Sequence, residues 1–155
     1  MSVPPEPTVR RCDAADVGVV TALRRAWAEE QAGRPIDDDD FPDAFAAWYT
    51  REAGRRVTWL ACVGHEPAGM LNLVVFEQMP KPGRPAARWG YVANAFVLAE
   101  HRNGGAGTAL LDAAVDFART HGFVRVVLNP SPRSAPLYRR AGFRPATELL
   151  MLPLD

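Results

Sequence analysis

A glycine-rich stretch in the last third of the chain has the clearest potential for chemistry. Residues 102–108 are Arg-Asn-Gly-Gly-Ala-Gly-Thr, between a predicted strand and a predicted helix. Glycines let the backbone approach a ligand closely because they carry no Cβ, and the first N–H groups of a helix have no partner within it. Such a turn binds phosphate, and Arg102 and the helix dipole add positive potential. The stretch therefore predicts a site for a phosphate-bearing ligand.

Two other phosphate motifs do not describe this stretch. The P-loop needs Lys and then Ser or Thr after its last glycine, whereas Gly107 here precedes Thr108 and Ala109. The dinucleotide-binding fingerprint needs the spacing Gly-x-Gly-x-x-Gly, which Gly104, Gly105 and Gly107 do not supply. A purely structural glycine-rich turn is the remaining alternative.

The elements that must position this loop follow from the periodicity of apolar residues. Apolar side chains recur at helical spacing after Asp13, a predicted N-cap, and form one stripe between residues 105 and 121. The turn at 64–67 joins two strand-like segments into a hairpin. The predicted helices run from Asp13 to about Gln31 and over 43–52, 105–121 and 134–141; the predicted strands are 8–11, 56–63, 68–78, 87–98, 125–128 and 148–152.

Length and composition indicate one globular domain. The 155 residues are 48% hydrophobic and 23% charged, which suffices to bury a core without disulfides or metals. Residues 1–7 contain three prolines and are predicted to form a flexible tail. Residues 8–155 are predicted to form a single domain.

Charge and cysteine content argue against several classes of protein. Eighteen basic residues balance eighteen acidic ones, so no global attraction to nucleic acid or to an anionic membrane is expected. No apolar run suggests a signal peptide or a membrane span, and a cytoplasmic location is the default expectation. Cys12 and Cys62 are expected to be reduced and packed, because a secreted disulfide scaffold would carry more cysteines.

A second motif near the C-terminus gives the glycine loop a family context. Residues 134–143 are Ser-Ala-Pro-Leu-Tyr-Arg-Arg-Ala-Gly-Phe. With the loop, this motif resembles the GNAT superfamily of acyl-CoA-dependent N-acyltransferases, over roughly residues 8–152 and with Ala99 in place of a frequent proline. The resemblance implies an α+β (mixed α/β) fold with a central, mostly antiparallel, twisted sheet of six to seven strands flanked by about four helices. The matching patterns are Arg102-x-x-Gly105-x-Gly107 and Leu137-Tyr138-x-x-x-Gly142-Phe143.

The resemblance implies acetyl-CoA as the co-substrate, and no metal. Backbone groups of Ala95, Phe96 and Val97 would pair with the pantetheine arm like an added strand. Ser131 stands where the family often has an asparagine that contacts the coenzyme, and Tyr138 would stand near the thioester sulfur. The pyrophosphate would be held beside Arg102 by the loop residues Asn103, Gly104, Gly105, Ala106, Gly107 and Thr108.

The implied reaction is direct attack by a neutral amine on the thioester carbonyl. A backbone N–H near Phe96 or Val97 would hold the oxyanion that develops. Tyr138 would act as the general acid that protonates the departing thiolate, with a purely structural tyrosine as the alternative. No covalent enzyme intermediate is required.

The sequence leaves the general base unassigned. The strand expected beside the acetyl group, residues 91–96, carries no carboxylate. Glu77, at the end of the preceding strand, is a candidate base, and a solvated strand-end charge is its alternative. A water chain through Asn94 or Tyr91 is another route, and both residues are candidate substrate contacts.

The acceptor is less defined than the donor. In the family, the first two helices and their loop wall the acceptor site, where Trp27 is a candidate contact. Acidic residues there, Glu29, Glu30 and the run 37–40, could receive a cationic amine together with aromatic side chains. The run 37–40 could instead be a solvated cap before a helix. The expected partner is a small-molecule or protein amine, and the resemblance also allows a homodimer. Oxygen acceptors and longer acyl groups stay open.

Two other functions also stay open. A non-catalytic acyl-CoA-binding sensor or interaction module would carry the same loop, and the missing strand carboxylate favours it. A different nucleotide-binding α/β domain would bind a nucleotide without needing the pantetheine arm. A turnover assay separates the sensor from an enzyme, because a sensor would bind the coenzyme and acetylate nothing.

Overall fold

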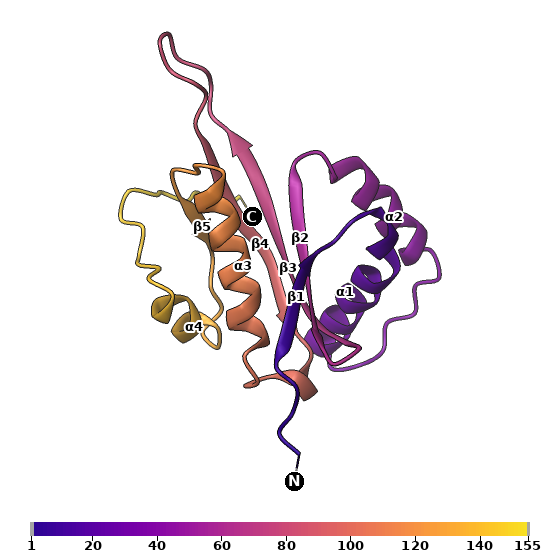
Figure 1. Ribbon diagram of the computed structural model, residues 1–155. Helices are drawn as coiled ribbons and strands as arrows, with labels where there is room; N and C mark the ends of the chain where they lie inside the picture. Colours follow the sequence, from indigo (N-terminus) through magenta and orange to yellow (C-terminus); the bar gives the residue numbers. More distant parts are fainter. Residues whose placement is uncertain (1, 155) are drawn as a thin grey trace.

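The computed structural model describes residues 2–154, which are organised around one five-stranded sheet (Figure 1). The strand order is β1-β2-β3-β4-β5, and neighbours are antiparallel except β4 and β5, which are parallel. The strands are β1 (Pro7–Arg11), β2 (Arg56–Val63), β3 (Glu66–Glu77), β4 (Arg88–Val97) and β5 (Val126–Leu128). The helices are α1 (Val17–Ala32), α2 (Phe41–Glu52), α3 (Ala106–Thr120) and α4 (Ala135–Arg140), with 3-10 turns at Ala14–Asp16 and Ala99–His101. The expected mixed α/β architecture, mostly antiparallel and with four helices, is confirmed.

The expectation of six to seven strands is wrong, because residues 2–154 form five. The segment 148–152, predicted as a strand, has no partner in the sheet, and Leu150 within it is 99% exposed. Its apolar residues favour a buried strand, but a strand also needs a neighbouring edge within reach of the chain. The sequence shows that this segment is apolar, but it does not show whether the edge of a sheet lies within its reach.

Helices cover both faces of the sheet (Figure 1). Leu110 and Leu111 of α3 are fully buried on one face, within the stripe that the sequence predicts. Val20 and Leu23 of α1 are buried on the other face, where α2 packs against α1. The predicted N-cap residue, Asp13, accepts a hydrogen bond from the backbone N–H of Ala15 (2.8 Å) and caps the 3-10 turn that leads into α1. The sheet thus separates α1 from α3, with β4 between them.

An extra residue in β4 and the shortness of β5 open the sheet on one side. The pairing of β3 with β4 shifts by one residue next to Asn72, which leaves Ala93 as an extra residue in β4. Such a β-bulge bends its strand and increases the local twist. β5 pairs with β4 only over residues 90–92. Within the described part of the chain, residues 93–97 therefore have a free edge where the two strands diverge.

This free edge of β4 offers backbone hydrogen-bonding groups. The N–H of Leu98 donates to the carbonyl of Ala68 on the β3 side (2.8 Å). Because backbone groups of an antiparallel strand alternate in direction, the N–H and C=O groups of Ala95 and Val97 point to the free edge. Accordingly, the carbonyl of Val97 accepts a hydrogen bond from Nε of Arg102 (3.0 Å). An extended ligand could join this edge as an added strand.

Gly69 of β3 sets how closely β3 approaches this part of β4. A Cβ at Gly69 would lie 2.5 Å from the carbonyl oxygen of Phe96 and 3.1 Å from Cα of Val97. Both neighbours are backbone atoms, so the strands would have to move apart. We expect Gly69→Ala to lower the free energy of unfolding by about 1–3 kcal/mol. Urea denaturation followed by circular dichroism measures this change.

Gly18 of α1 provides the control for this prediction. Apart from the local helix backbone and the two chain neighbours, no atom lies within 4 Å of a Cβ built at Gly18, and the position is helical. Gly18→Ala should therefore be neutral or stabilising by about 0.5–1 kcal/mol. Equal unfolding free energies for the two variants would contradict the close approach at Gly69.

Candidate functional site

A pocket of about 580 Å³ lies where the free edge of β4 meets the beginnings of α3 and α4. It gathers residues that lie far apart in the sequence, from α1 to α4. Gly104 belongs to the same loop but does not line the pocket. The pocket is lined by these sequence-predicted residues: Trp27, Ala95, Phe96, Val97, Arg102, Asn103, Gly105, Ala106, Gly107, Thr108, Ser131 and Tyr138.

The glycine loop leaves the N-terminus of α3 open towards this pocket. Gly105 is the N-cap, with φ of 93°, and no side chain caps the helix. The N–H of Ala109 makes the first helical bond, to the carbonyl of Gly105 (3.0 Å). The N–H groups of residues 106–108 precede that bond and have no partner within the helix. Residues 106–108 therefore present an anion-binding helix terminus that suits a phosphate group.

Gly107 keeps space open between this terminus and β4. A Cβ at Gly107 would lie 3.4 Å from Cδ2 of Leu137 and 3.9 Å from Cγ2 of Val97. Any side chain there would therefore extend into the space between α3, α4 and the free edge. The loop thus fits a ligand whose pyrophosphate sits at the helix terminus and whose extended arm follows β4.

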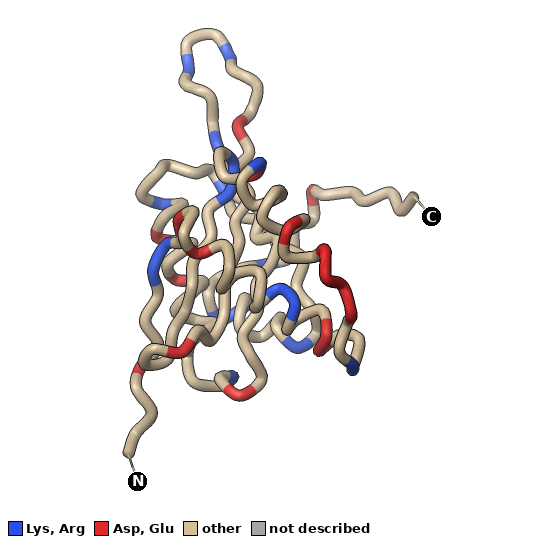
Figure 2. The backbone as a smooth tube through the Cα atoms, turned by 90° about the vertical axis from the view of Figure 1, so that its right-hand side faces the viewer, with Lys and Arg blue, Asp and Glu red and all other residues tan. Residues whose placement is uncertain are grey.

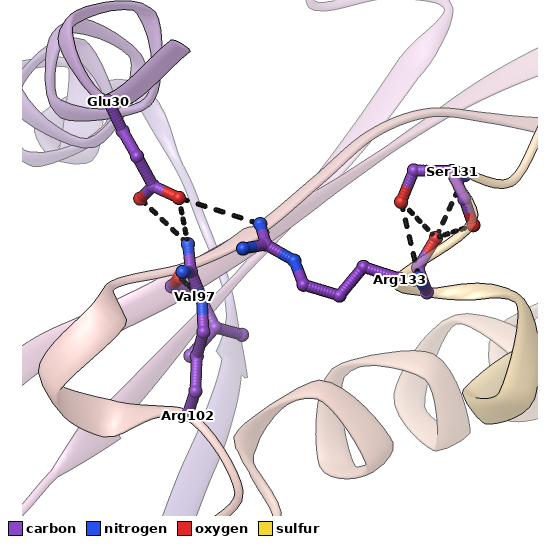
Figure 3. Close-up of polar contacts among 6 residues, drawn as sticks. Glu30, Val97, Arg102, Ser131 and Arg133 are labelled. Carbon is purple, nitrogen blue, oxygen red and sulfur yellow. Dashed lines mark hydrogen bonds and ion pairs between the residues drawn. The ribbon is translucent and has the colours of Figure 1, made fainter. Parts of the chain in front are cut away.

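Three charged side chains meet at the mouth of the pocket (Figure 3). Arg102 donates from Nη2 to both carboxylate oxygens of Glu30 on α1 (2.7 Å each). Arg133, just before α4, lies 3.5 Å from the same carboxylate. The hydrogen bond from Arg102 lowers the pKa of Glu30, so its carboxylate stays ionised. Sequence reasoning missed this ion pair, because no local pattern shows a contact of α1 with Arg102 or with the chain before α4.

Glu30 places a negative charge beside the proposed phosphate site. We expect Glu30→Gln to tighten the binding of a phosphate-bearing coenzyme about two- to fivefold, because Arg102 and Arg133 would then be free to face the phosphates. Arg102 would keep its bond to Val97. Calorimetric titration with acetyl-CoA at low ionic strength measures the change.

Glu29→Gln is the matched control for this prediction. Glu29 accepts a hydrogen bond from the N–H of Ile36 (3.1 Å) and does not line the pocket. The control should bind acetyl-CoA like the parent protein. Weaker binding by Glu30→Gln would mean that Glu30 supports the site rather than competing with the ligand.

Tyr138 reaches the pocket from α4. The residue is 8% exposed and packs edge-on against Phe143, with ring centroids 5.8 Å apart. Tyr138 lines the pocket, and within residues 2–154 no hydrogen bond to its hydroxyl is formed. Burial raises the pKa of Tyr138 above its ordinary value of 10, so the phenol keeps its proton at neutral pH. An unpaired, protonated phenol can donate to a ligand atom in the pocket.

Ser131 lines the pocket but also shapes the start of α4. Its Oγ lies 2.8 Å from Oγ of Ser134, and the N–H of Ser134 donates to it (3.2 Å; Figure 3). The N–H of Ala135 donates to the carbonyl of Ser131 (3.0 Å). This serine therefore fixes the turn that brings Tyr138 to the pocket.

Glu77, Tyr91 and Asn94 do not line the pocket. Glu77 is exposed and lies opposite Arg88. It is five residues along β3 from the bulge region, or about 16 Å at the usual rise of a strand. Tyr91 and Asn94 lie on either side of the bulged residue, so they flank the place where β4 and β5 diverge. The geometry brings these two near the site and leaves Glu77 away from it.

A polar cluster next to Asn94 escaped the sequence analysis. Asn72, directly opposite Asn94, is 5% exposed and donates to Oγ1 of Thr58 (2.7 Å). Arg56 donates to Oδ1 of Asn72 (2.8 Å), and its guanidinium lies over the ring of Trp48 on α2. The alternation of β2 and β3 could have shown that Thr58 and Asn72 share a face, but not that they pair. The cluster places polar groups on the α1–α2 side of the bulge.

The two cysteines do not line the pocket. Cys12 and Cys62 are both free, and burial raises the pKa of Cys12 to about 12, so this thiol is a poor nucleophile. Within residues 2–154, no group of three or more His, Cys, Asp or Glu side chains could hold a metal ion. In the same range, every helix is too short or too polar to cross a membrane.

The chain is similar in sequence and in structure to known proteins. The sequence model of the Acetyltransferase (GNAT) family matches residues 20–143. The glucosamine 6-phosphate N-acetyltransferase of Trypanosoma brucei brucei is 28% identical over 102 residues, covering 63% of this chain and 66% of that enzyme, just under two thirds. A GCN5-related N-acetyltransferase from Ralstonia eutropha has a TM-score of 0.71 at 28% identity, covering 95% of this chain and 98% of that one. A predicted acetyltransferase from Clostridium acetobutylicum, solved with acetyl-CoA, has a TM-score of 0.74 at 20% identity, covering 95% and 96%, and shares the fold.

Proposed function

Because this chain belongs to the GNAT acetyltransferase family, we propose that it is an N-acetyltransferase that moves an acetyl group from acetyl-CoA to a primary amine. One observation carries the proposal. A single pocket joins the free edge of β4, the open N-terminus of α3 and the unpaired hydroxyl of Tyr138. These are the three groups that an acyl-CoA thioester needs for its arm, its pyrophosphate and its leaving sulfur.

The donor is held mainly by backbone groups. Ala95 offers its free-edge N–H and C=O groups to the amides of the pantetheine arm. The N–H groups at the start of α3 hold the pyrophosphate. The N–H of Val97 is the better candidate for the oxyanion, since the backbone groups of Phe96 point towards β3. Binding the donor along β4 then brings the thioester carbonyl within reach of the N–H of Val97.

Transfer then proceeds by direct attack. The nitrogen of a neutral amine forms a bond with the thioester carbonyl carbon, and the carbon–sulfur bond breaks. Tyr138 gives its proton to the departing thiolate, and a water chain through Asn94 or Tyr91 takes the proton that the amine nitrogen loses. Holding both substrates in one pocket supplies the proximity. The distance of Glu77 from the pocket makes the water route preferable to a direct role for that carboxylate.

A small-molecule amine is the favoured acceptor. The curated relative is named for glucosamine 6-phosphate, which carries a primary amine. Trp27 of α1 stacks on Phe96 (5.7 Å between centroids) and provides an aromatic wall beside the donor strand. The α1–α2 connection is anchored, because Arg25 donates to the carbonyls of Ile36 (2.6 Å) and Asp38 (2.8 Å). This anchored segment and α1 form the wall on the acceptor side.

The test has two parts. The parent protein should bind acetyl-CoA in calorimetric titration, and a panel of primary amines, including glucosamine 6-phosphate, should release free thiol from acetyl-CoA. Binding without turnover for any amine would support the non-catalytic sensor instead. A folded protein that does not bind acetyl-CoA would refute both functions.

A further inference from the structure

The chain contains a single lysine, Lys81, and its other seventeen basic residues are arginines. The guanidinium group of an arginine stays protonated in proteins, so it does not act as a nucleophile. Lys81 therefore carries the one primary amine among the side chains of this protein. A primary amine is also the group that the proposed enzyme acetylates.

Lys81 lies near the tip of the β3–β4 connection, residues 78–87, which is named the arm. Figures 1 and 2 show that the arm projects beyond the body of the molecule. Next to the sheet, the N–H of Gln78 donates to the carbonyl of Ala87 (2.7 Å), and further out Lys81 and Arg84 form an isolated bridge. Lys81 is exposed, and lysine carries its amine on a flexible four-carbon stem.

The residues at the tip of the arm form a narrow turn. Pro82 and Gly83 are its central residues, and Gly83 has φ of 76°. The N–H of Arg84 donates to the carbonyl of Lys81 (3.3 Å). Proline followed by a glycine of positive φ is typical of a type II turn. Because neither central residue carries a long side chain, the tip is slender enough to present the amine to a concave site.

The base of the arm is fixed, which keeps Lys81 away from the pocket of its own chain. Phe76 stacks on Trp89 (4.5 Å between centroids), and the guanidinium of Arg125 lies over the same indole ring (5.1 Å). β4 begins beside the arm at Arg88 and reaches the pocket at Ala95. These two positions are about 23 Å apart at the usual rise of a strand, and the arm points the other way (Figure 1). An acetyl group can therefore reach Lys81 only from another copy.

The charges of the arm and of the acceptor side are complementary. The tip carries Lys81 and Arg84, whereas residues 37–40 of the α1–α2 connection are four exposed aspartates. Opposite charges on two surfaces guide their encounter and suppress wrong orientations. Because this connection belongs to the proposed acceptor wall, a tip attracted to it arrives beside the pocket of the second copy.

We propose that Lys81 is a modification site, acetylated by a second copy of the same protein; this inference rests on the proposed function. The neutral Nζ of Lys81 forms a bond with the thioester carbonyl carbon in the pocket of the other copy, and the carbon–sulfur bond breaks. Tyr138 of that copy protonates the departing thiolate, and the water chain takes the proton that Nζ loses. The products are an acetylated Lys81, which has lost its charge, and free coenzyme A.

Mixing two variants with acetyl-CoA tests the transfer between copies. Lys81→Arg keeps the charge of the tip and an intact pocket, but it has no lysine to acetylate. Gly107→Glu keeps Lys81, but its carboxylate extends into the space of the coenzyme. Intact-mass spectrometry should show one added acetyl group on the Gly107→Glu chain only when Lys81→Arg is present. Peptide mapping should locate this group on Lys81.

A dilution series of the parent protein gives a second readout that needs no variant. About tenfold dilution should lower the rate of Lys81 acetylation per chain about tenfold, because two chains must meet. A rate per chain that does not change on dilution would overturn the proposal.

The remaining outcomes separate this inference from the proposed function. Lys81→Arg should acetylate small amines at the parent rate, since Lys81 lies outside its own pocket. Acetylation of small amines without transfer to Lys81 would overturn the inference and leave the proposed function intact. Equal modification of Gly107→Glu with and without Lys81→Arg, or modification of the α-amino group alone, would also overturn the inference. If no amine at all is acetylated, the proposed function fails and this inference fails with it.

Discussion

Tyr138→Phe should lower kcat for amine acetylation about 100- to 10,000-fold, because the phenol is the proposed proton donor to the thiolate. The aromatic ring would still pack against Phe143, so the fold should be kept. The Kd for acetyl-CoA should change by no more than about threefold, since a phenol hydroxyl contributes about one hydrogen bond. Steady-state kinetics and calorimetry on the same preparation measure the two quantities.

The pH dependence adds a second readout for Tyr138. Because burial raises its pKa above 10, the phenol stays protonated through neutral and mildly alkaline pH. The rate of the parent enzyme should therefore rise from pH 7 to 9, as the amine loses its proton, and should not fall until above about pH 10. A fall in activity near pH 8 would contradict this assignment.

Tyr49→Phe is the control for the tyrosine prediction. The hydroxyl of Tyr49 donates to the carbonyl of Asp13 (2.9 Å), and this residue does not line the pocket. Losing that bond should affect stability and leave kcat near the parent value. If Tyr138→Phe kept full kcat, Tyr138 would be a packing residue and the thiolate would take its proton from water.

Gly107→Glu should weaken acetyl-CoA binding about 100-fold or more. The added side chain would enter the space between α3 and β4, and its carboxylate would face the phosphates at close range, where like charges are strongly unfavourable. Gly107 lies in the first turn of α3 without a positive φ, so the backbone tolerates the change. Calorimetric titration measures the Kd, and circular dichroism checks the fold.

Gly104→Glu adds the same charge to the same loop outside the pocket. A Cβ at Gly104 would lie 3.6 Å from the carbonyl oxygen of His101, which is an ordinary contact. Its Kd should stay within a few-fold of the parent value, because an exposed charge is screened. Gly105 is not suitable for this comparison, since its φ of 93° would strain any side chain. Parent-like binding by Gly107→Glu would place the pyrophosphate elsewhere.

Local sequence signals predicted most of the elements around the pocket. The stripe of α3, the β2–β3 hairpin and the loop between β4 and α3 all lie within short windows, where periodicity and turn residues are directly visible. α2 begins at Phe41, two residues before the predicted start, with Pro42 in its first turn. Proline is well tolerated there, because the first turn needs no N–H bond. Pro42 therefore belongs to the helix, and the predicted start at residue 43 was two residues too late.

Features that depend on distant neighbours could not be predicted in the same way. The extra residue Ala93 is defined only by its register against β3. The ion pair of Glu30 with Arg102 joins residues 72 positions apart. Residues 148–152 have the composition of a strand, but they pair with no strand of the described chain. In each case the missing information is which segments become neighbours in space.

The free edge of β4 also affects which substitutions the protein can accept during evolution. Ala95 and Val97 contribute main-chain groups, which almost any residue can supply, so donor binding tolerates sequence drift there. The proposed acceptor wall consists of side chains of α1 and of the connection to α2, which Arg25 holds through two carbonyl groups. New side chains in residues 33–40 could thus alter the choice of amine without disturbing the strand that carries the acyl donor. Laboratory evolution of acceptor specificity would accordingly concentrate its substitutions in that connection.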